Sequence, residues 1–132
     1  MQKRFFVSFL VVFILGVWVF PGAETQAQGR DVEEVEFTVL GNCGMCKDRI
    51  ERAAYTVRGV RRADWSQEEQ KLMLSFRSDR TDQETVERTI AKAGHDTENF
   101  LTDDETHANL HHCCIYERNP ELLKKNKVWN VE

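Results

Sequence analysis

The feature that most constrains the fold of this chain is the way its hydrophobic periodicity changes between residues 34 and 101. Residues 34–40 alternate between apolar and polar side chains, which is typical of a half-buried strand. From Cys46 onward, apolar residues recur at helical spacing until Gly59, which predicts the end of a helix. A strand followed by an amphipathic helix is therefore expected at the start of this region.

The second half of the region predicts two strands before its helix. Residues 60–65 and 71–76 alternate on either side of a polar turn, which indicates a hairpin. Residues 81–84 have the Thr-x-x-Glu form of a capping box, and apolar residues then follow at helical spacing up to Gly94. Residues 95–101 are interpreted as a fourth strand, mainly because the fold needs one.

The order strand, helix, strand, strand, helix, strand predicts an α+β fold, the ferredoxin-like βαββαβ sandwich. We place this domain at residues 33–101 and treat residues 102–132 as a C-terminal extension that contains cysteines and that the core does not require. The formal net charge of -4 argues against a nucleic-acid or anionic-lipid partner.

The first residues resemble an export signal. Two basic residues precede an almost unbroken apolar run over residues 5–20, and Thr-Gln-Ala then forms a small-residue cleavage site. We expect residues 1–27 to be a signal peptide cleaved after Ala27, which makes this an exported protein of the periplasm or cell envelope. The alternative is an uncleaved anchor, because the run is only a little shorter than the roughly 20 residues that span a bilayer.

The four cysteines of the chain form two close pairs, Cys43 with Cys46 and Cys113 with Cys114. An even number of cysteines in an exported protein is compatible with structural disulfides. Each of these pairs would close only a very short loop, however, and would restrict the unfolded chain little. The spacing therefore favours a chemical role over a structural one.

Cys43-Gly44-Met45-Cys46 lies between the end of a predicted strand and the start of a predicted helix. Free backbone N–H groups and the positive end of the helix dipole favour thiolate over thiol at that place. Two thiolates suit a soft ion of low coordination number such as Cu(I), whereas Zn(II) usually takes four ligands.

This arrangement of strand, Cys-x-x-Cys loop and helix resembles the heavy-metal-associated domain of copper chaperones, metal-pumping ATPases and periplasmic mercury-binding proteins. The resemblance covers about residues 33–101. It implies the same fold, with Cys43 and Cys46 as ligands for Cu(I) first, and for Hg(II), Zn(II) or Cd(II) behind it. It also implies sequestration of the ion or its delivery by ligand exchange, with a metal-transporting membrane protein as partner and no enzymatic activity.

Two further positions follow from the same resemblance. His95 occupies the place of a residue that lies beside the metal loop in the family, so it is a candidate third ligand or a group that tunes the pKa of the thiols. The alternative is an exposed loop histidine. The family commonly has Met two residues before its first cysteine, where this chain has Gly41, and we expect Leu40 or Met45 to fill the space.

The extension carries His111, His112, Cys113 and Cys114 in one run, and all four are candidate ligands for soft or borderline ions. Neighbouring side chains of an extended segment point to opposite sides, so the four need a turn to reach one ion. We expect one or two of them to fold back onto Cys43 and Cys46. A vicinal disulfide, or simple packing, is the alternative.

Two other functions remain open from the sequence. A thiol-disulfide oxidoreductase also places Cys-x-x-Cys at a helix start, but thioredoxin-like folds use a cis-proline opposite the cysteines, and the only prolines here are Pro21 and Pro120. The third hypothesis is a metal-sensing or interaction module, in which the extension becomes ordered when metal binds.

Overall fold

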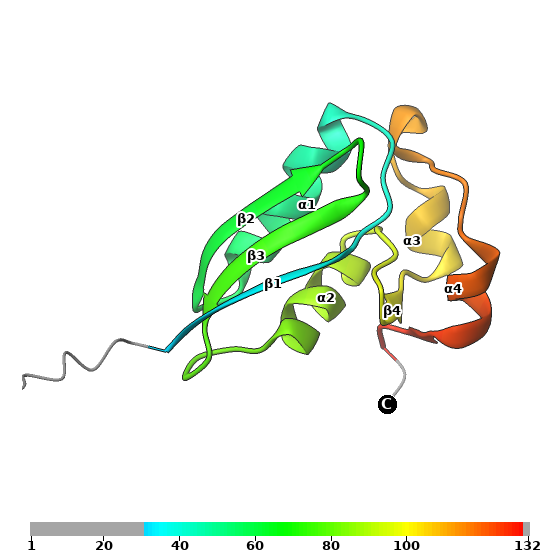
Figure 1. The fold of residues 1–132 in the computed structure, drawn as a ribbon. Coiled ribbons are helices and arrows are strands. Elements are labelled where there is room, and N and C mark those ends of the chain that lie inside the picture. The colour runs from blue at the N-terminus through cyan, green and yellow to red at the C-terminus, as the bar shows by residue number, and fades with distance from the viewer. Residues whose placement is uncertain (1–30, 131–132) are drawn as a thin grey trace, which may run out of the picture.

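The structure is a computed structural model that describes residues 31–130 of the chain. The predicted signal sequence lies outside the described residues. Figure 1 shows the described elements, which follow one another as β1 Val32–Thr38, α1 Gly44–Thr56, β2 Val60–Ser66, β3 Lys71–Arg77, α2 Gln83–Lys92, β4 Phe100–Leu101, α3 Asp104–Ala108, the 3-10 turn η1 His112–Cys114, α4 Pro120–Lys125 and β5 Lys127–Val128. No helix between residues 31 and 130 is long and apolar enough to cross a membrane.

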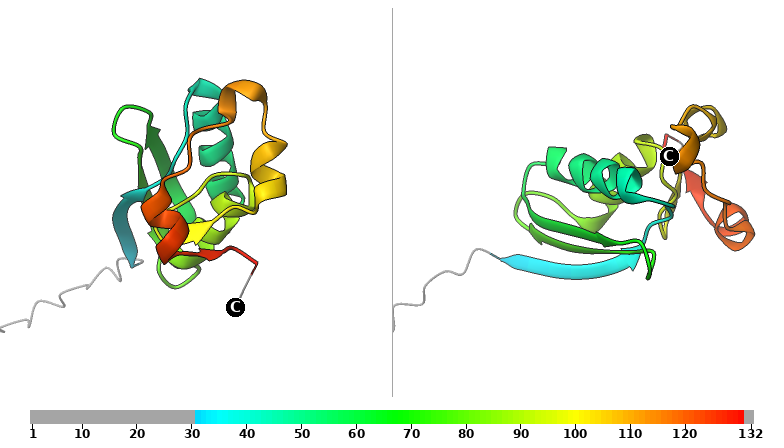
Figure 2. Two further views of the ribbon diagram at one scale, coloured as in Figure 1. Left: turned by 90° about the vertical axis from the view of Figure 1, so that its right-hand side faces the viewer. Right: turned by 90° about the horizontal axis from the view of Figure 1, so that it is seen from above.

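The three longest strands form one antiparallel sheet in the order β1-β3-β2, and α1 and α2 cover the same face of it (Figure 2). The alternation seen in the sequence decides which face is covered. Phe37 pairs with Leu72 across β1 and β3, and Leu72 pairs with Trp65 across β3 and β2, and all three side chains are buried. The predicted α+β, ferredoxin-like class is confirmed.

Strand β2 departs from simple alternation at its start. The ladder with β3 shifts register between Val60 and Arg62, which is a β-bulge. Regular alternation would place Val60 on the face opposite Ala63 and Trp65, and the sequence predicts that arrangement. The bulge instead lets Val60 pack against the buried cluster that contains Ala63 and Trp65.

The two main helices begin and end at residues with identifiable roles. Helix α1 ends just before Gly59, whose φ of +119° is accessible to glycine at little cost. Helix α2 begins one residue later than the predicted capping box. Its N-cap is Asp82, because the Asp82 carboxylate accepts a hydrogen bond from the amide of Thr85 at 2.8 Å.

The predicted fourth strand is much shorter in the structure. An isolated bridge pairs Thr97 with Val39, the residue after β1, and Phe100–Leu101 pair in parallel with β5 of the extension. The buried carboxylate of Glu87 explains the difference, since it accepts hydrogen bonds from the Thr97 hydroxyl at 2.8 Å and from the amide of Asn99 at 3.0 Å. These contacts hold the segment as a turn.

The extension packs against the end of α2 and the loop that follows it. The amide of Trp129 donates to the carbonyl of Leu101 at 2.9 Å, and Arg88 of α2 donates to the carbonyl of Trp129 at 2.8 Å. Leu110 is buried and lies directly over Gly94. The extension is therefore integrated with the domain, although the sequence gives no reason for the core to require it.

Candidate metal centre

The first cysteine pair is positioned by the loop between β1 and α1. Cys43 is the N-cap residue of α1 with an extended backbone, and Cys46 lies in the first turn of that helix, fully buried. The Sγ atoms of Cys43 and Cys46 are 3.6 Å apart. The amide of Asn42, which precedes the N-cap, donates to the Sγ of Cys46 at 3.3 Å, so the loop supplies a backbone donor to this sulfur.

Trp65 occupies the space beside this loop. Its indole N–H donates to the carbonyl of Val39 at 2.9 Å, and its ring packs against Gly41. A Cβ at Gly41 would lie 2.9 Å from the Cβ of Cys46 and 3.1 Å from the Trp65 ring, so no larger residue fits there without movement. The expectation for Met45 is wrong, because its side chain is 48% exposed.

The second cysteine pair lies against the first. The turn η1 carries Cys113 and Cys114, and it sits beside the loop that precedes α1 (Figures 1 and 2). The Sγ of Cys43 is 3.4 Å from that of Cys113 and 3.7 Å from that of Cys114, and the last two sulfurs are 3.9 Å apart. All four cysteines are free thiols. Because the backbone turns at η1, the side chains of the neighbouring residues Cys113 and Cys114 can both approach Cys43.

The thiols differ in their tendency to ionise. Burial acts to raise the pKa of Cys43, but hydrogen bonds from the Cys46 backbone N–H and from the thiols of Cys113, Cys46 and Cys114 together lower that pKa from 9.0 to about 7. Burial, with the neighbouring sulfurs of Cys46 and Cys43, raises the pKa of Cys114. Cys43 is therefore about half ionised at pH 7 and loses its proton more readily than Cys113 and Cys114, whose pKa values are raised.

The histidines of the extension lie at the edge of the sulfur cluster. The Nδ1 of His111 is 3.3 Å from the Sγ of Cys113. His112 is exposed, and its ring lies 4.1 Å from that of His111, between centroids. Among residues 31–130, the group of three ligand atoms within 4.8 Å of one another consists of the Cys43, Cys113 and Cys114 sulfurs and includes no histidine.

His95 is fully buried, which contradicts the alternative of an exposed loop histidine. Its Nδ1 donates to the carbonyl of Leu40 at 2.9 Å, because a carbonyl can only accept, and its buried Nε2 has no partner in the part of the chain described. Burial lowers the pKa of His95 to about 4. His95 thus ties the turn after α2 to the residue that precedes the metal loop.

Four residues that position the centre were not singled out from the sequence. The side-chain amide of Asn42 donates to the carbonyl of Ile115 at 3.0 Å, which joins the metal loop directly to the extension. The hydroxyl of Tyr116 accepts from the amide of Asp96 at 2.6 Å, and the carboxylate of Asp96 binds Arg118. A buried aromatic and an arginine close to two cysteines are the only hints that the sequence offers.

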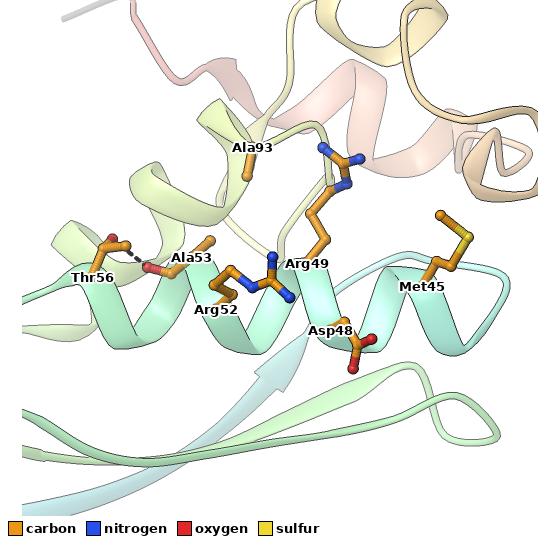
Figure 3. Close-up of a pocket in the computed structure, with 7 residues that line it drawn as sticks. All are labelled: Met45, Asp48, Arg49, Arg52, Ala53, Thr56 and Ala93. Atoms are coloured by element: carbon orange, nitrogen blue, oxygen red, sulfur yellow. Dashed lines mark hydrogen bonds between the residues drawn. The ribbon is translucent and has the colours of Figure 1, made fainter.

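An open hollow of about 430 Å³ runs along α1 beside this centre (Figure 3). Figure 3 shows Met45 at one end and the Arg49 and Arg52 side chains along it. The hollow is lined by Met45, Asp48, Arg49, Arg52, Ala53, Thr56 and Ala93. No cysteine lines it, but Met45 joins it to the sulfur cluster, because its Sδ lies 3.6 Å from the Sγ of Cys113.

Comparison with known proteins gives matches among solved structures alone. Neither a scan against protein-family models nor a search of curated proteins found a match. The solution structure of a candidate copper-ion-binding protein from Bacillus anthracis str. Ames is 21% identical with a TM-score of 0.50, over 52% of this chain and 99% of that chain. Oxidized MerP from Ralstonia metallidurans CH34 is 23% identical with a TM-score of 0.49, over 52% of this chain and 96% of that chain.

A third match is the N-terminal domain of a potential copper-translocating P-type ATPase from Bacillus subtilis, in its Cu(I)-loaded state. It is 20% identical with a TM-score of 0.49, over 51% of this chain and 85% of that chain. At these identities the matches concern the fold. The chain shares its ferredoxin-like fold with the Bacillus anthracis protein, and nearly half of the chain has no counterpart in that structure.

Proposed function

We propose that this protein binds a soft metal ion, Cu(I) first, through the thiolates of Cys43 and Cys46, and that it sequesters the ion or delivers it by ligand exchange in the cell envelope. The observation that carries the proposal is the pair of free sulfurs 3.6 Å apart at the N-terminus of α1. On this proposal the protein carries its ion and does not transform it.

The chemistry of this sulfur pair supports a soft ion. A thiol must lose its proton to bind a metal, and the pKa of Cys43, about 7, makes this loss easy at neutral pH. Thiolate sulfur suits soft ions, and two thiolates suit an ion of low coordination number such as Cu(I), whereas Zn(II) usually takes four ligands. Hg(II) and Cd(II) are the further soft candidates. The copper-ion-binding description of the Bacillus anthracis protein of the same fold supports this order.

The setting and the partner are part of the proposal. The signal-like residues 1–27 support export, with cleavage after Ala27, to the periplasm or cell envelope. A metal-transporting membrane protein is the partner that would take the ion by exchange of thiolate ligands. Mass spectrometry of the protein isolated from an envelope extract is expected to give a mature N-terminus at Gln28, and a chain that keeps its first residues would support the uncleaved anchor.

Anaerobic titration with Cu(I) against a chromophoric chelator tests the proposal. The double variant Cys43→Ser/Cys46→Ser is expected to lose tight binding. Met73→Ser is the control, because it removes an exposed sulfur on the sheet face opposite the helices, away from the cluster. If the double variant competes with the chelator as well as the unchanged protein does, the proposal is wrong. The thiol-disulfide oxidoreductase reading would then be tested by measuring a reduction potential.

A further inference from the structure

Three sulfurs from distant parts of the chain form a triangle beside the Cys-x-x-Cys loop. The sides of the triangle are 3.4 Å from Cys43 to Cys113, 3.7 Å from Cys43 to Cys114 and 3.9 Å from Cys113 to Cys114. Cys43 and Cys113 are half-buried and Cys114 is fully buried, so an ion among them would be largely shielded from water.

These spacings match those that one metal ion imposes on its thiolate ligands. A tetrahedral ion with sulfurs at about 2.3 Å holds the sulfurs about 3.8 Å from one another. A trigonal ion with similar bond lengths requires nearly the same spacing. The three sulfurs are therefore already placed for a single soft ion, and binding would need shifts of a few tenths of an ångström.

The extension that carries two of these sulfurs is fixed on both sides of them. Before the cysteines, Leu110 is buried against Gly94. After them, the carbonyl of Ile115 accepts a hydrogen bond from the side chain of Asn42, and Arg118 forms an ion pair with buried Asp96 at 2.7 Å. Because these anchors hold the turn in place, the sulfurs do not meet by chance contact of a free tail.

Cys43 belongs to two sets of sulfurs. Cys46 is 3.6 Å from it in the loop, and Cys113 and Cys114 of the extension form the triangle with it. A site made of the loop alone offers two thiolates. With Cys113 and Cys114 of the extension, the number of thiolates available to one ion rises to three or more.

We propose that Cys113 and Cys114 are metal ligands that join Cys43, so that the extension closes the centre and holds the same soft ion with at least three thiolates. The inference rests on the proposed function, since it assigns further ligands to the same site. Each thiol that binds releases its proton to solvent, and no oxidation is involved. As a consequence the protein retains its ion, because a partner must displace the sulfurs of the extension before it can take the ion.

X-ray absorption of the Cu(I)-loaded full chain tests the inference by counting sulfur ligands. The unchanged protein is expected to show three or more sulfurs, and Cys113→Ser/Cys114→Ser is expected to show two. Loss of an outer-shell group commonly costs about 10- to 100-fold in metal affinity, so the loss of ligands should weaken Cu(I) binding at least about tenfold. Glu117→Ser is the control, since it changes an exposed side chain of the same segment.

The outcomes separate this inference from the proposed function. If both the unchanged protein and Cys113→Ser/Cys114→Ser show two sulfur ligands and bind Cu(I) with equal affinity, the inference is overturned. If Cys43→Ser/Cys46→Ser loses binding in the same experiments, the proposed function still stands. Binding that none of these substitutions changes would overturn both.

A measurement on the unchanged protein covers the case in which a variant does not fold. At a pH at which Cys113 of the metal-free protein is alkylated, one equivalent of Cu(I) is expected to protect Cys113, as read by mass spectrometry of the peptides; Cys114 is fully buried and is not used as a probe. Equal alkylation of Cys113 in the metal-free and the loaded protein would overturn the inference.

Discussion

Arg118 binds both carboxylate oxygens of Asp96, with its Nε at 2.8 Å from one oxygen and its Nη2 at 2.7 Å from the other. The Asp96 side chain is fully buried and that of Arg118 is 14% exposed. Asp96 follows the end of α2, and Arg118 lies shortly after Cys113 and Cys114. This ion pair therefore determines where the second pair of cysteines sits relative to the first.

Replacement of Arg118 by Ala is expected to destabilise the protein by about 3 kcal/mol, because it leaves a buried carboxylate without its cation. Chemical denaturation would measure the change, and limited proteolysis should cut the extension faster. Arg62→Ala is the matched control, since its pair with Asp64 is exposed and such pairs contribute about 0–1 kcal/mol. Equal stability of the two variants would show that the pair does not anchor the extension.

Replacement of Gly94 by Ala is expected to destabilise the protein by about 1–3 kcal/mol, as measured by thermal unfolding. Gly94 has a φ of +110°, which a residue with a Cβ adopts at a cost, and the new Cβ would lie 2.6 Å from the Cδ2 of Leu110. Leu110 would have to move, and the extension with it. Unchanged stability would mean that Leu110 is not packed there in solution.

Gly44→Ala provides the contrast for this prediction. No atom lies within 4 Å of a Cβ at Gly44, and its φ is not in the left-handed region. Gly44 is also the first residue of α1, where Ala is the better helix former. The variant is expected to unfold at the same temperature as the unchanged protein or slightly higher.

The parts of the fold that the sequence predicted depend on local patterns. The alternation in 34–40 and 71–76 places Phe37 and Leu72 in the core, because side chains of a strand alternate between faces whatever the rest of the chain does. The fourth strand has no such pattern. Its turn depends on Glu87, a buried carboxylate of α2, and no local rule predicts that a glutamate on a helix will bind the backbone of a later loop.

The candidate metal centre could likewise be predicted only in part from local patterns. Spacing alone singled out Cys43 and Cys46, and ligand chemistry singled out Cys113 and Cys114, but their 3.4–3.7 Å approach to Cys43 depends on contacts between distant residues. The Asp96–Arg118 pair and the packing of Trp65 on Gly41 are examples of such contacts. Whether the cysteines of the extension and the histidines bind metal stays a prediction.

His95 predicts how the stability of the metal-free protein depends on pH. Burial lowers its pKa in the folded state from 6.5 to about 4. Between these values the unfolded chain binds a proton that the folded protein does not, so stability is expected to fall as pH drops from about 6.5 to about 4. The contribution is on the order of 3 kcal/mol across the whole interval.

Denaturation of the unchanged protein and of His95→Gln, at several pH values, would measure this effect. Glutamine keeps a donor that can reach the carbonyl of Leu40 but does not titrate, so the variant is expected to lose stability less steeply below pH 6.5. Parallel curves for the two proteins would show that His95 has the same pKa in the folded and unfolded states and that its burial does not control the pH dependence.

The pKa of Cys43, about 7, predicts selective alkylation of this thiol in the reduced, metal-free protein. Thiolate is the nucleophile, so the rate of carbamidomethylation of Cys43 should rise to half its maximum near that pH, while Cys113, whose pKa is raised, should react only at higher pH. Peptide mass spectrometry over a pH series would follow both sites.

The double variant Cys113→Ala/Cys114→Ala tests the cause of this shift. It removes two of the thiols that hydrogen-bond to Cys43 but keeps the backbone N–H of Cys46, so the half-point for Cys43 is expected to move from about 7 part of the way toward 9.0. Serine is unsuitable here, because its hydroxyl would still donate. A half-point that does not move would mean that the backbone N–H and thiol of Cys46 account for the shift and that the sulfurs of the extension lie farther away in solution.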